Sequence, residues 1–333
     1  MKLEIAQSTP TAASIAMLVQ EHYGLSEVVE SEFLRRSFNQ VYRLGLTDGR
    51  SLVARLSAER PRGAPNLQFE AAALEHWAEA GCRVSRCVPT AGGEIAIEVP
   101  LPEGPRALML FEHLPGEFTG DTALDIEAFA RGLAVLHTAG ESYAGPESAY
   151  RLDLDYLLQR PLQGLLRAPT MTAELRPQFE ELGERLQAAI LALGELSQVL
   201  CHGDAHGSNN FIQIDAQARR EAVFFDFDEA GPGCLAYELA VYPWNLHPRT
   251  VDGVLSDKAA QQWRHFISAY REARPVPDAD LAAIPRFMAA RQFWLLGEYA
   301  GRIPVWGSQA MPTDYLRRQV TMLRKWETLE LPL

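Results

Sequence analysis

Apolar and polar residues alternate along residues 37–57, SFNQVYRLGLTDGRSLVARLS, on both sides of Asp48-Gly49. Alternation with a period of two is typical of strands with one buried face, and an Asp-Gly pair is a strong hairpin signal. The segment therefore predicts two antiparallel strands. Residues 66–81, NLQFEAAALEHWAEAG, have helical periodicity instead, and Gly81 is placed to end that helix.

The pattern of hydrophobic positions changes further along the chain. Residues 92–116, GGEIAIEVPLPEGPRALMLFEHLPG, predict two short strands joined by a Pro/Gly turn. From residue 122 onward helical periodicity predominates, interrupted by a short apolar strand within 223–233, VFFDFDEAGPG. We therefore predict an α+β chain with two lobes: a small antiparallel-sheet lobe over residues 1–114 and a mostly helical lobe over 115–333.

Length and composition agree with two lobes. The 333 residues exceed the usual size of one compact core, and 47% apolar residues is ordinary for a globular protein. No run approaches the roughly 18 apolar residues that a membrane helix requires, and the N-terminal segment does not resemble a secretory signal. Four irregularly spaced cysteines do not form a disulfide framework. We expect a cytoplasmic protein that does not bind membranes.

Charge narrows the class of partner. The net charge of −12 argues against nucleic acid, which requires a basic stripe. Residues 1–110 carry 11 basic and 13 acidic side chains, whereas the remaining 223 carry 20 and 30. An acidic C-terminal portion favours a cationic small molecule through electrostatic steering, although a merely soluble acidic surface has the same composition.

Chemistry-bearing residues concentrate in VLCHGDAHGSNNFI, residues 199–212, and in the segment after it. Asn209 lies five positions after Asp204, and Asp226 lies 22 positions after Asp204 at the end of an apolar strand. Phosphoryl transfer needs one carboxylate to orient the attacking hydroxyl and accept its proton. It also needs oxygen ligands for Mg²⁺, and a carboxylate with an amide oxygen suits that ion. This spacing predicts Asp204 as the base and Asn209 and Asp226 as metal ligands.

These two segments resemble the aminoglycoside phosphotransferase and choline kinase superfamily, which includes the bacterial stress-response kinase A and type II homoserine kinases. HGDAHGSNNF and VFFDFDEAGPGCLAYELA match the family's catalytic and metal loops over residues 199–240, and a weaker, collinear match covers 37–140. The resemblance implies a two-lobed, protein-kinase-like fold. It also implies an ATP- and Mg²⁺-dependent transfer of the γ-phosphate to a hydroxyl group.

The resemblance also assigns the charged pair that holds the phosphates. The family usually places a lysine on the strand SLVARLS, where this chain has Arg55, and no lysine occurs between residues 3 and 257. Arginine grips phosphate as a planar fork. Glu70, on the following helix, is the expected ion-pair partner of Arg55.

Further nucleotide contacts follow from the same resemblance. The hairpin that would cover the phosphates lacks the glycine-rich pattern, so Ser37 and Asn39 are the expected contacts there. LMLFEHLPGEF resembles the family's connection between lobes, where the backbone of Glu112 and Leu114 would meet adenine. His202 is expected to be a hydrogen-bonding strut of the catalytic loop.

We expect the acceptor to be a small molecule with a hydroxyl group, and an amine-bearing one of the aminoglycoside, amino alcohol or homoserine type. Aromatic residues of the helical lobe, with Glu298 nearby, could surround an ammonium group through cation–π contacts, or could simply belong to the core. These aromatic residues are Tyr237, Tyr242, Trp244, Trp294, Tyr299 and Trp306.

Three other functions fit parts of the pattern. A serine/threonine protein kinase of the stress-response type uses the same loops. A nucleotide-binding pseudokinase would explain Arg55 and the glycine-poor hairpin, but would not need Asp204. A metal-dependent hydrolase could use the following ligand types, although the eight histidines form no second cluster. These candidate ligands are Cys201, His202, Asp204, His206, Asp226 and Asp228.

Overall fold

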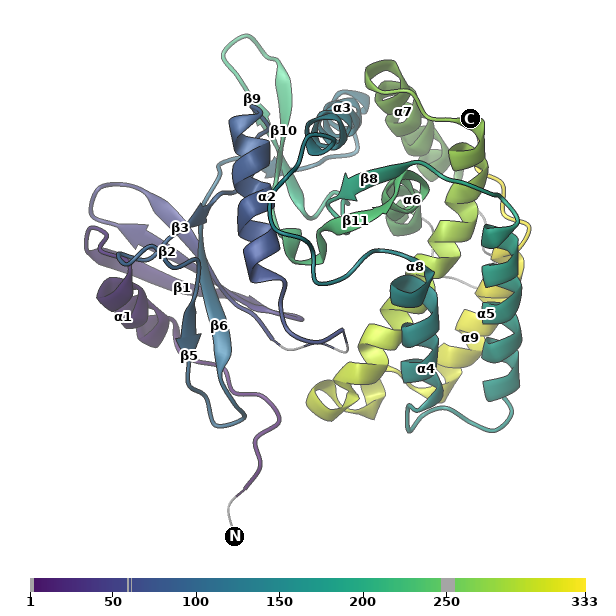
Figure 1. The fold of residues 1–333 in the computed structure, drawn as a ribbon, viewed down its shortest axis with the longest axis horizontal. Coiled ribbons are helices and arrows are strands. Elements are labelled where there is room, and N and C mark those ends of the chain that lie inside the picture. The colour runs from purple at the N-terminus through teal and green to yellow at the C-terminus, as the bar shows by residue number, and fades with distance from the viewer. Residues whose placement is uncertain (1–2, 59, 61, 247–254) are drawn as a thin grey trace. The chain divides into compact units, whose positions relative to one another are not determined.

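The computed structural model describes residues 3–58, 60, 62–246 and 255–333. The chain divides into two compact units, Met1–Pro115 with Ala144–Glu147, and Gly116–Tyr143 with Ser148–Leu333. The first is built on an antiparallel sheet and the second is mostly helical (Figure 1). Whether the predicted boundary at residue 114 separates independently folding domains stays a prediction.

The first unit contains one sheet with the strand order β1-β2-β3-β6-β4, and β5 also pairs with β6. Its strands are β1 (Val28–Arg36), β2 (Gln40–Leu46), β3 (Ser51–Leu56), β4 (Cys87–Val88), β5 (Ile97–Val99) and β6 (Arg106–Glu112). Its helices are α1 (Ala12–His22) and α2 (Leu67–Glu79). The predicted hairpin is β2–β3, with Gly49 at φ 85° in the turn, where a side chain would be strained.

The edge strand β1 was not predicted from the hydrophobic pattern. Its residues, VVESEFLRR, are exposed along almost the whole strand, so no alternation of apolar and polar positions marks it. One face of the neighbouring strands is buried, in contrast. Leu52, Ala54 and Leu56 of β3 share an apolar core with Ile15 and Val19 of α1. Because side chains alternate across a strand, Arg55, which lies between Ala54 and Leu56, points to the face opposite theirs.

The second unit surrounds two small antiparallel sheets with helices. Its strands are β7 (Glu117–Phe118), β8 (Gln198–Cys201), β9 (Asn210–Ile214), β10 (Arg220–Phe224) and β11 (Gly231–Cys234). Its helices are α3 (Ala123–Gly140), α4 (Arg160–Leu166), α5 (Arg176–Leu191), α6 (Leu235–Leu246), α7 (Asp257–Ala273), α8 (Asp278–Trp306) and α9 (Thr313–Trp326). Shorter helical turns lie at Asp155–Gln159, Phe227–Glu229 and Ser308–Ala310. The helical character predicted for this part of the chain is therefore confirmed.

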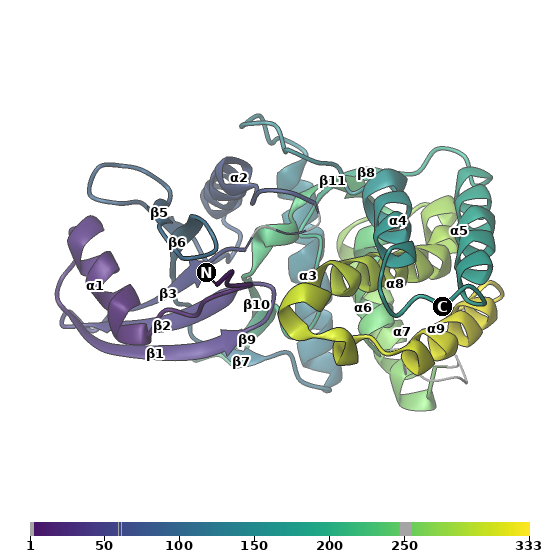
Figure 2. The ribbon, with the colours of Figure 1, turned by 90° about the horizontal axis from the view of Figure 1, so that it is seen from below.

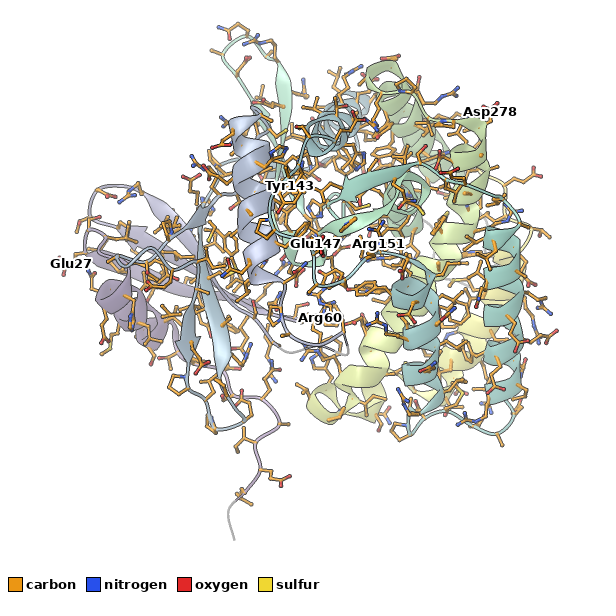
Figure 3. The ribbon with its side chains drawn as sticks, viewed as in Figure 1. Glu27, Arg60, Tyr143, Glu147, Arg151 and Asp278 are labelled. Atoms are coloured by element: carbon orange, nitrogen blue, oxygen red, sulfur yellow. The ribbon has the colours of Figure 1, made fainter. Side chains whose placement is uncertain are left out.

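The longest helix of this unit is α8, which begins at Asp278 (Figure 3). It is buried on most of its sides, because α4, α5, α6 and α9 all contact it (Figure 2). Within the described residues, no helix is both long and apolar enough to cross a bilayer.

Strand pairing brings the two predicted loops together. The catalytic segment runs from the end of β8 to the start of β9, and the predicted metal loop follows β10. In the β9–β10 pair Asn210 lies opposite Phe224, and one step further the Phe225 N–H donates to the Asn209 carbonyl at 3.2 Å. Asn209 and Asp226 therefore leave the same end of this sheet.

Candidate active site

The catalytic loop depends on a glycine. Gly203 has φ 85°, and a Cβ atom added there would lie 2.2 Å from the carbonyl oxygen of Glu229. Two neighbouring residues of α6 hold the glycine backbone on both sides. The Tyr237 hydroxyl donates to the Gly203 carbonyl, and the Gly203 N–H donates to Glu238 Oε2, each at 2.9 Å. These two hydrogen bonds fix the backbone from which the next residue, Asp204, projects.

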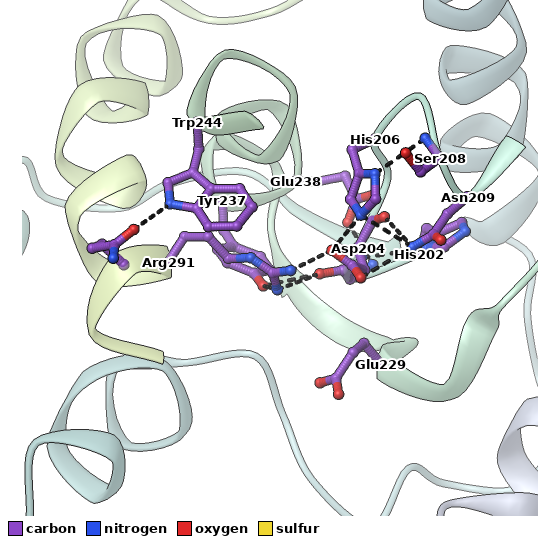
Figure 4. A network of polar contacts seen from close by, with 12 residues as sticks. His202, Asp204, His206, Ser208, Asn209, Glu229, Tyr237, Glu238, Trp244 and Arg291 are labelled. Carbon is purple, nitrogen blue, oxygen red and sulfur yellow. Dashed lines mark hydrogen bonds and ion pairs between the residues drawn. The ribbon is translucent and has the colours of Figure 1, made fainter. Parts of the chain in front are cut away.

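The Asp204 carboxylate is surrounded by donors (Figure 4). Asn209 Nδ2 donates to Oδ2 at 3.0 Å, while Oδ1 is ion-paired with Arg291 and lies 3.5 Å from His206 Nε2. Burial raises the pKa of Asp204, but the positive charge of Arg291 outweighs it and holds this pKa well below its usual range. The side chain keeps 21% of its surface exposed. The result is an ionised and accessible proton acceptor at neutral pH.

Two histidines fix the loop in different ways. Burial lowers the pKa of His202 to about 4, so its ring is neutral. Its Nδ1 accepts from the Asp204 N–H at 3.3 Å, which leaves Nε2 to donate to the Phe225 carbonyl at 3.0 Å. His202 is thus a strut between the two loops, as expected. His206 Nδ1 accepts from the Ser208 N–H at 3.2 Å, so Nε2 is the ring nitrogen that carries a hydrogen, and it lies 3.5 Å from Asp204 Oδ1.

The predicted metal ligands offer oxygen atoms of the right kind. Asn209 Nδ2 donates to the carboxylate and to the carbonyl of Asp204, both at 3.0 Å, so its amide oxygen is the atom left for a cation. Asp226 is partly exposed and has left-handed backbone angles, φ 66° and ψ 56°. Such angles are uncommon outside glycine and cluster at functional sites. An amide and a carboxylate oxygen from adjoining segments fit Mg²⁺.

The predicted charged pair of the first unit is formed. Arg55 Nη1 and Nη2 donate to the two oxygens of Glu70 at 2.7 and 2.5 Å, and the two side chains are 4% and 3% exposed. The Arg55 guanidinium also lies 4.8 Å from the ring centre of Phe111. A guanidinium has five N–H donors, and Glu70 takes two of them.

The other predicted nucleotide contacts lie in the same unit. Ser37 and Asn39 form the turn between β1 and β2, where the Ser37 N–H donates to the Asn39 carbonyl at 2.9 Å. Asn39 is buried, and its Oδ1 accepts from the Ala58 N–H at 3.3 Å. Glu112 ends β6 and Leu114 follows two residues later.

The backbone of Glu112 is already used within the first unit. Its N–H donates to the Arg86 carbonyl at 2.9 Å, and its carbonyl accepts from the Ser85 hydroxyl at 2.6 Å. A nucleobase could therefore reach Glu112 only through the second lone pair of that carbonyl.

Arg291, which was not predicted as a site residue, contacts the catalytic loop. Besides Asp204, its guanidinium donates to the Tyr237 hydroxyl at 3.0 Å and the Gly203 carbonyl at 3.3 Å. The rings of Trp294 and Trp244 lie 3.8 and 5.0 Å from it. These two rings, expected to form a core or an ammonium box, therefore hold a cation of the chain itself. The available signal was the position of Arg291 within the apolar segment FMAARQFWLL of α8.

A hydrolase centre would require three or more metal-binding side chains to converge. No group of three His, Cys, Asp or Glu residues with that geometry occurs in the described part of the chain. Cys201 is also fully buried, and burial raises the pKa of its thiol well above the usual value. The described residues therefore show no side-chain cluster of the kind that the hydrolase alternative would use.

Comparisons with known proteins agree with this geometry. Residues 32–276 match the model of the phosphotransferase enzyme family. An uncharacterized protein of Deinococcus radiodurans is 36% identical over 319 residues, which cover 96% of this chain and 90% of that protein.

Solved structures confirm the fold. A microcompartment-associated aminopropanol kinase has a TM-score of 0.73 and 20% identity, and the match covers 96% of this chain and 100% of that one. An amicoumacin kinase, solved in complex with AMP-PNP and Ca²⁺, has a TM-score of 0.72 and 18% identity, covering 93% and 92%. The expected α+β, two-lobed, kinase-like fold is confirmed. Together with the family match, it shows that this chain belongs to the phosphotransferase enzyme family.

Proposed function

We propose that this protein is an ATP-dependent kinase that transfers the γ-phosphate to a hydroxyl group of a small molecule. The observation that carries this proposal is the Asp204 carboxylate, ionised and partly open, with the Asn209 amide hydrogen-bonded to it and Asp226 on the adjoining loop. The two loops adjoin through the hydrogen bond between the Phe225 N–H and the Asn209 carbonyl. Phosphoryl transfer to an alcohol needs a carboxylate that accepts the hydroxyl proton and, close to it, oxygen ligands for Mg²⁺.

Asp204 accepts the proton of the acceptor hydroxyl as its oxygen attacks the γ-phosphorus. The new O–P bond forms while the bond from that phosphorus to the β,γ-bridging oxygen breaks, and its electron pair leaves on ADP. Asn209 and Asp226 would hold Mg²⁺, which neutralises charge on the phosphate oxygens. Arg55, steadied by Glu70, provides a fixed positive charge for the phosphates.

The remaining predicted residues bind the nucleotide. Ser37 and Asn39 would contact the phosphates from the turn between β1 and β2. The Glu112 carbonyl and the Leu114 backbone would contact adenine. The amicoumacin kinase with AMP-PNP supports the choice of an adenine nucleotide, because the folds are alike.

We infer that the acceptor carries an amine. The acidic composition of the chain beyond residue 110 favours a cation. One of the similar solved structures is named as an aminopropanol kinase, and aminopropanol is an amino alcohol. The expected cytoplasmic location remains a prediction.

A panel assay tests this function. The purified protein is incubated with [γ-³²P]ATP, Mg²⁺ and one acceptor at a time: amino alcohols, homoserine or aminoglycosides. We expect label on an acceptor, together with ADP release that depends on that acceptor. Asp226→Ala should abolish both and should also remove the Mg²⁺ dependence of nucleotide binding.

The same assay separates the alternatives. Nucleotide binding without transfer to any acceptor would favour a pseudokinase. Label on serine or threonine of a protein substrate would favour the protein-kinase alternative. Tightly held zinc with hydrolytic activity and no transfer would favour a hydrolase. Each of these results would contradict the proposed small-molecule kinase.

A further inference from the structure

We propose that Arg291 is a positioning residue for the transfer reaction: it holds Oδ1 of Asp204, so that Oδ2 receives the proton of the acceptor hydroxyl. This inference rests on the proposed function. Neither the motifs of the catalytic and metal loops nor the family match assigns a role to Arg291, which lies 87 residues beyond Asp204 in the sequence. The first argument is the cost of burying this arginine.

The Arg291 side chain is only 2% exposed. A buried charge is costly unless an opposite charge and hydrogen bonds compensate for its lost hydration. Asp204 supplies the opposite charge, while Tyr237 and Gly203 supply neutral acceptors. Asp204 and Gly203 lie in the catalytic loop, and Tyr237 donates to the Gly203 carbonyl. The hydrogen bonds of Arg291 are therefore directed at that loop.

The second argument is which atom of Asp204 each donor contacts. Arg291 and His206 face Oδ1, and Asn209 Nδ2 donates to Oδ2. A carboxylate oxygen has two acceptor sites. Oδ1 is therefore engaged on two sides, whereas Oδ2 has room for one more donor, which we assign to the acceptor hydroxyl.

The third argument is rigidity. The guanidinium carbon lies 3.8 and 5.0 Å from the ring centres of Trp294 and Trp244. The Trp244 ring N–H donates to Gln292 on α8 at 2.9 Å, which holds that ring beside Arg291 (Figure 4). Contact with these rings therefore fixes the guanidinium, and the guanidinium fixes the carboxylate. A displacement of about 1 Å at a reacting group costs on the order of 10²-fold in rate.

The test is chemical rescue. Arg291→Ala would open an aromatic slot beside Asp204, and guanidinium ion can occupy such a slot without being attached to the chain. We expect Arg291→Ala to lower kcat by about 10²-fold with little change in KM for ATP. Guanidinium, at concentrations too low to unfold the protein, should restore part of kcat. Arg291→Lys should also lose kcat, because an ammonium lacks the planar fork.

Arg302→Ala is the matched control. Arg302 is a buried arginine of the same helix whose guanidinium lies 6.0 Å from the ring of Trp306. Its replacement should lower stability, and guanidinium should not raise its kcat. Circular dichroism would check that each variant is folded. If Arg291→Ala does not fold, Arg291→Lys carries the test.

Two results would overturn the proposal: a folded Arg291 variant with kcat within about threefold of the parent protein, or guanidinium activation that is equal in Arg302→Ala. Failure of the underlying function is distinguishable. If Asp204→Ala keeps full transfer activity, Asp204 is not the base, and the outcome for Arg291 no longer bears on positioning. If Asp204→Ala is inactive and Arg291→Ala is fully active, only the role of Arg291 is wrong.

Discussion

A buried arginine–carboxylate pair lies in each unit, and the two pairs differ in one respect. In the first unit Arg55 and Glu70 are 4% and 3% exposed, and the guanidinium takes both carboxylate oxygens. In the second unit Arg291 is equally buried, but Asp204 keeps 21% exposure, and the ion pair uses one oxygen. An aromatic ring lies against each guanidinium.

The difference explains how one chemical pairing supports two roles. A carboxylate closed on both oxygens can only hold its arginine, so Glu70 makes Arg55 a rigid cation. A carboxylate held by one oxygen can still accept a proton at the other, so Arg291 makes Asp204 a rigid base. The following experiments test this contrast.

We call Arg55–Glu70 the closed pair, because both carboxylate oxygens are bonded, and Arg291–Asp204 the open pair. The largest effect on stability is expected when the closed pair loses its carboxylate. Glu70→Ala should lower the unfolding free energy by about 3–5 kcal/mol, because it leaves the Arg55 charge buried without its carboxylate. Denaturant unfolding measures this loss. The control is Glu75→Ala on the same helix, whose ion pair with Arg86 is 46% exposed on both sides and should contribute less than about 1 kcal/mol. Equal losses in the two variants would contradict the larger stability cost assigned to breaking the buried Arg55–Glu70 pair.

The backbone beneath the open pair provides a second test. Gly203→Ala should cost about 3 kcal/mol and most of the transfer activity, since its Cβ would meet the Glu229 carbonyl at 2.2 Å. Gly194→Ala is the control, because Gly194 has a similar φ of 79° but no described atom within 4 Å of its added Cβ. That variant should lose about 1 kcal/mol and no activity. Comparable activity in the two variants would contradict the support assigned to Gly203.

A smaller effect, which depends on pH, is expected at Glu238. Burial raises the pKa of Glu238 to about 7, so between about pH 4.5 and about pH 7 the folded protein binds a proton that the unfolded chain has released. This contribution to stability is present at low pH and is lost as pH rises through about 7. Glu238→Gln keeps an acceptor for the Gly203 N–H but cannot titrate.

Relative to the parent protein, Glu238→Gln should therefore gain about 2 kcal/mol of unfolding free energy between about pH 4.5 and pH 7.5. The comparison must be made between the two proteins, because His202 acts in the opposite direction. Burial lowers the pKa of His202 to about 4, so its contribution rises with pH over the same range. Parallel pH profiles of the two proteins would contradict the raised pKa.

The closed pair was predictable from sequence and the open pair only in part. A strong local pattern marks the strand and the helix that carry Arg55 and Glu70, and the family resemblance implied that the two residues pair. Asp204, Asn209 and Asp226 lie in short motifs whose spacing is itself informative. The β9–β10 pairing that brings these motifs together was not predicted, because only the strand within residues 223–233 had been recognised.

The remaining features depend on long-range packing. Arg291 meets Asp204 because α8 packs on α6, and no local pattern specifies that contact. Trp244 and Trp294 have the helical spacing of ordinary core residues, which does not indicate that they enclose a guanidinium. The edge strand β1 was missed for the opposite reason, since its exposed face leaves no periodic signal.

The most direct measurement is the single-turnover rate of phosphoryl transfer in Asp204→Asn, followed by rapid quench with saturating acceptor. Asparagine has nearly the shape of aspartate, but its amide cannot take the hydroxyl proton. We predict a 10²–10⁴-fold slower transfer, with nucleotide affinity within about threefold of the parent protein. Transfer at the parent rate would contradict the assignment of Asp204 as the base.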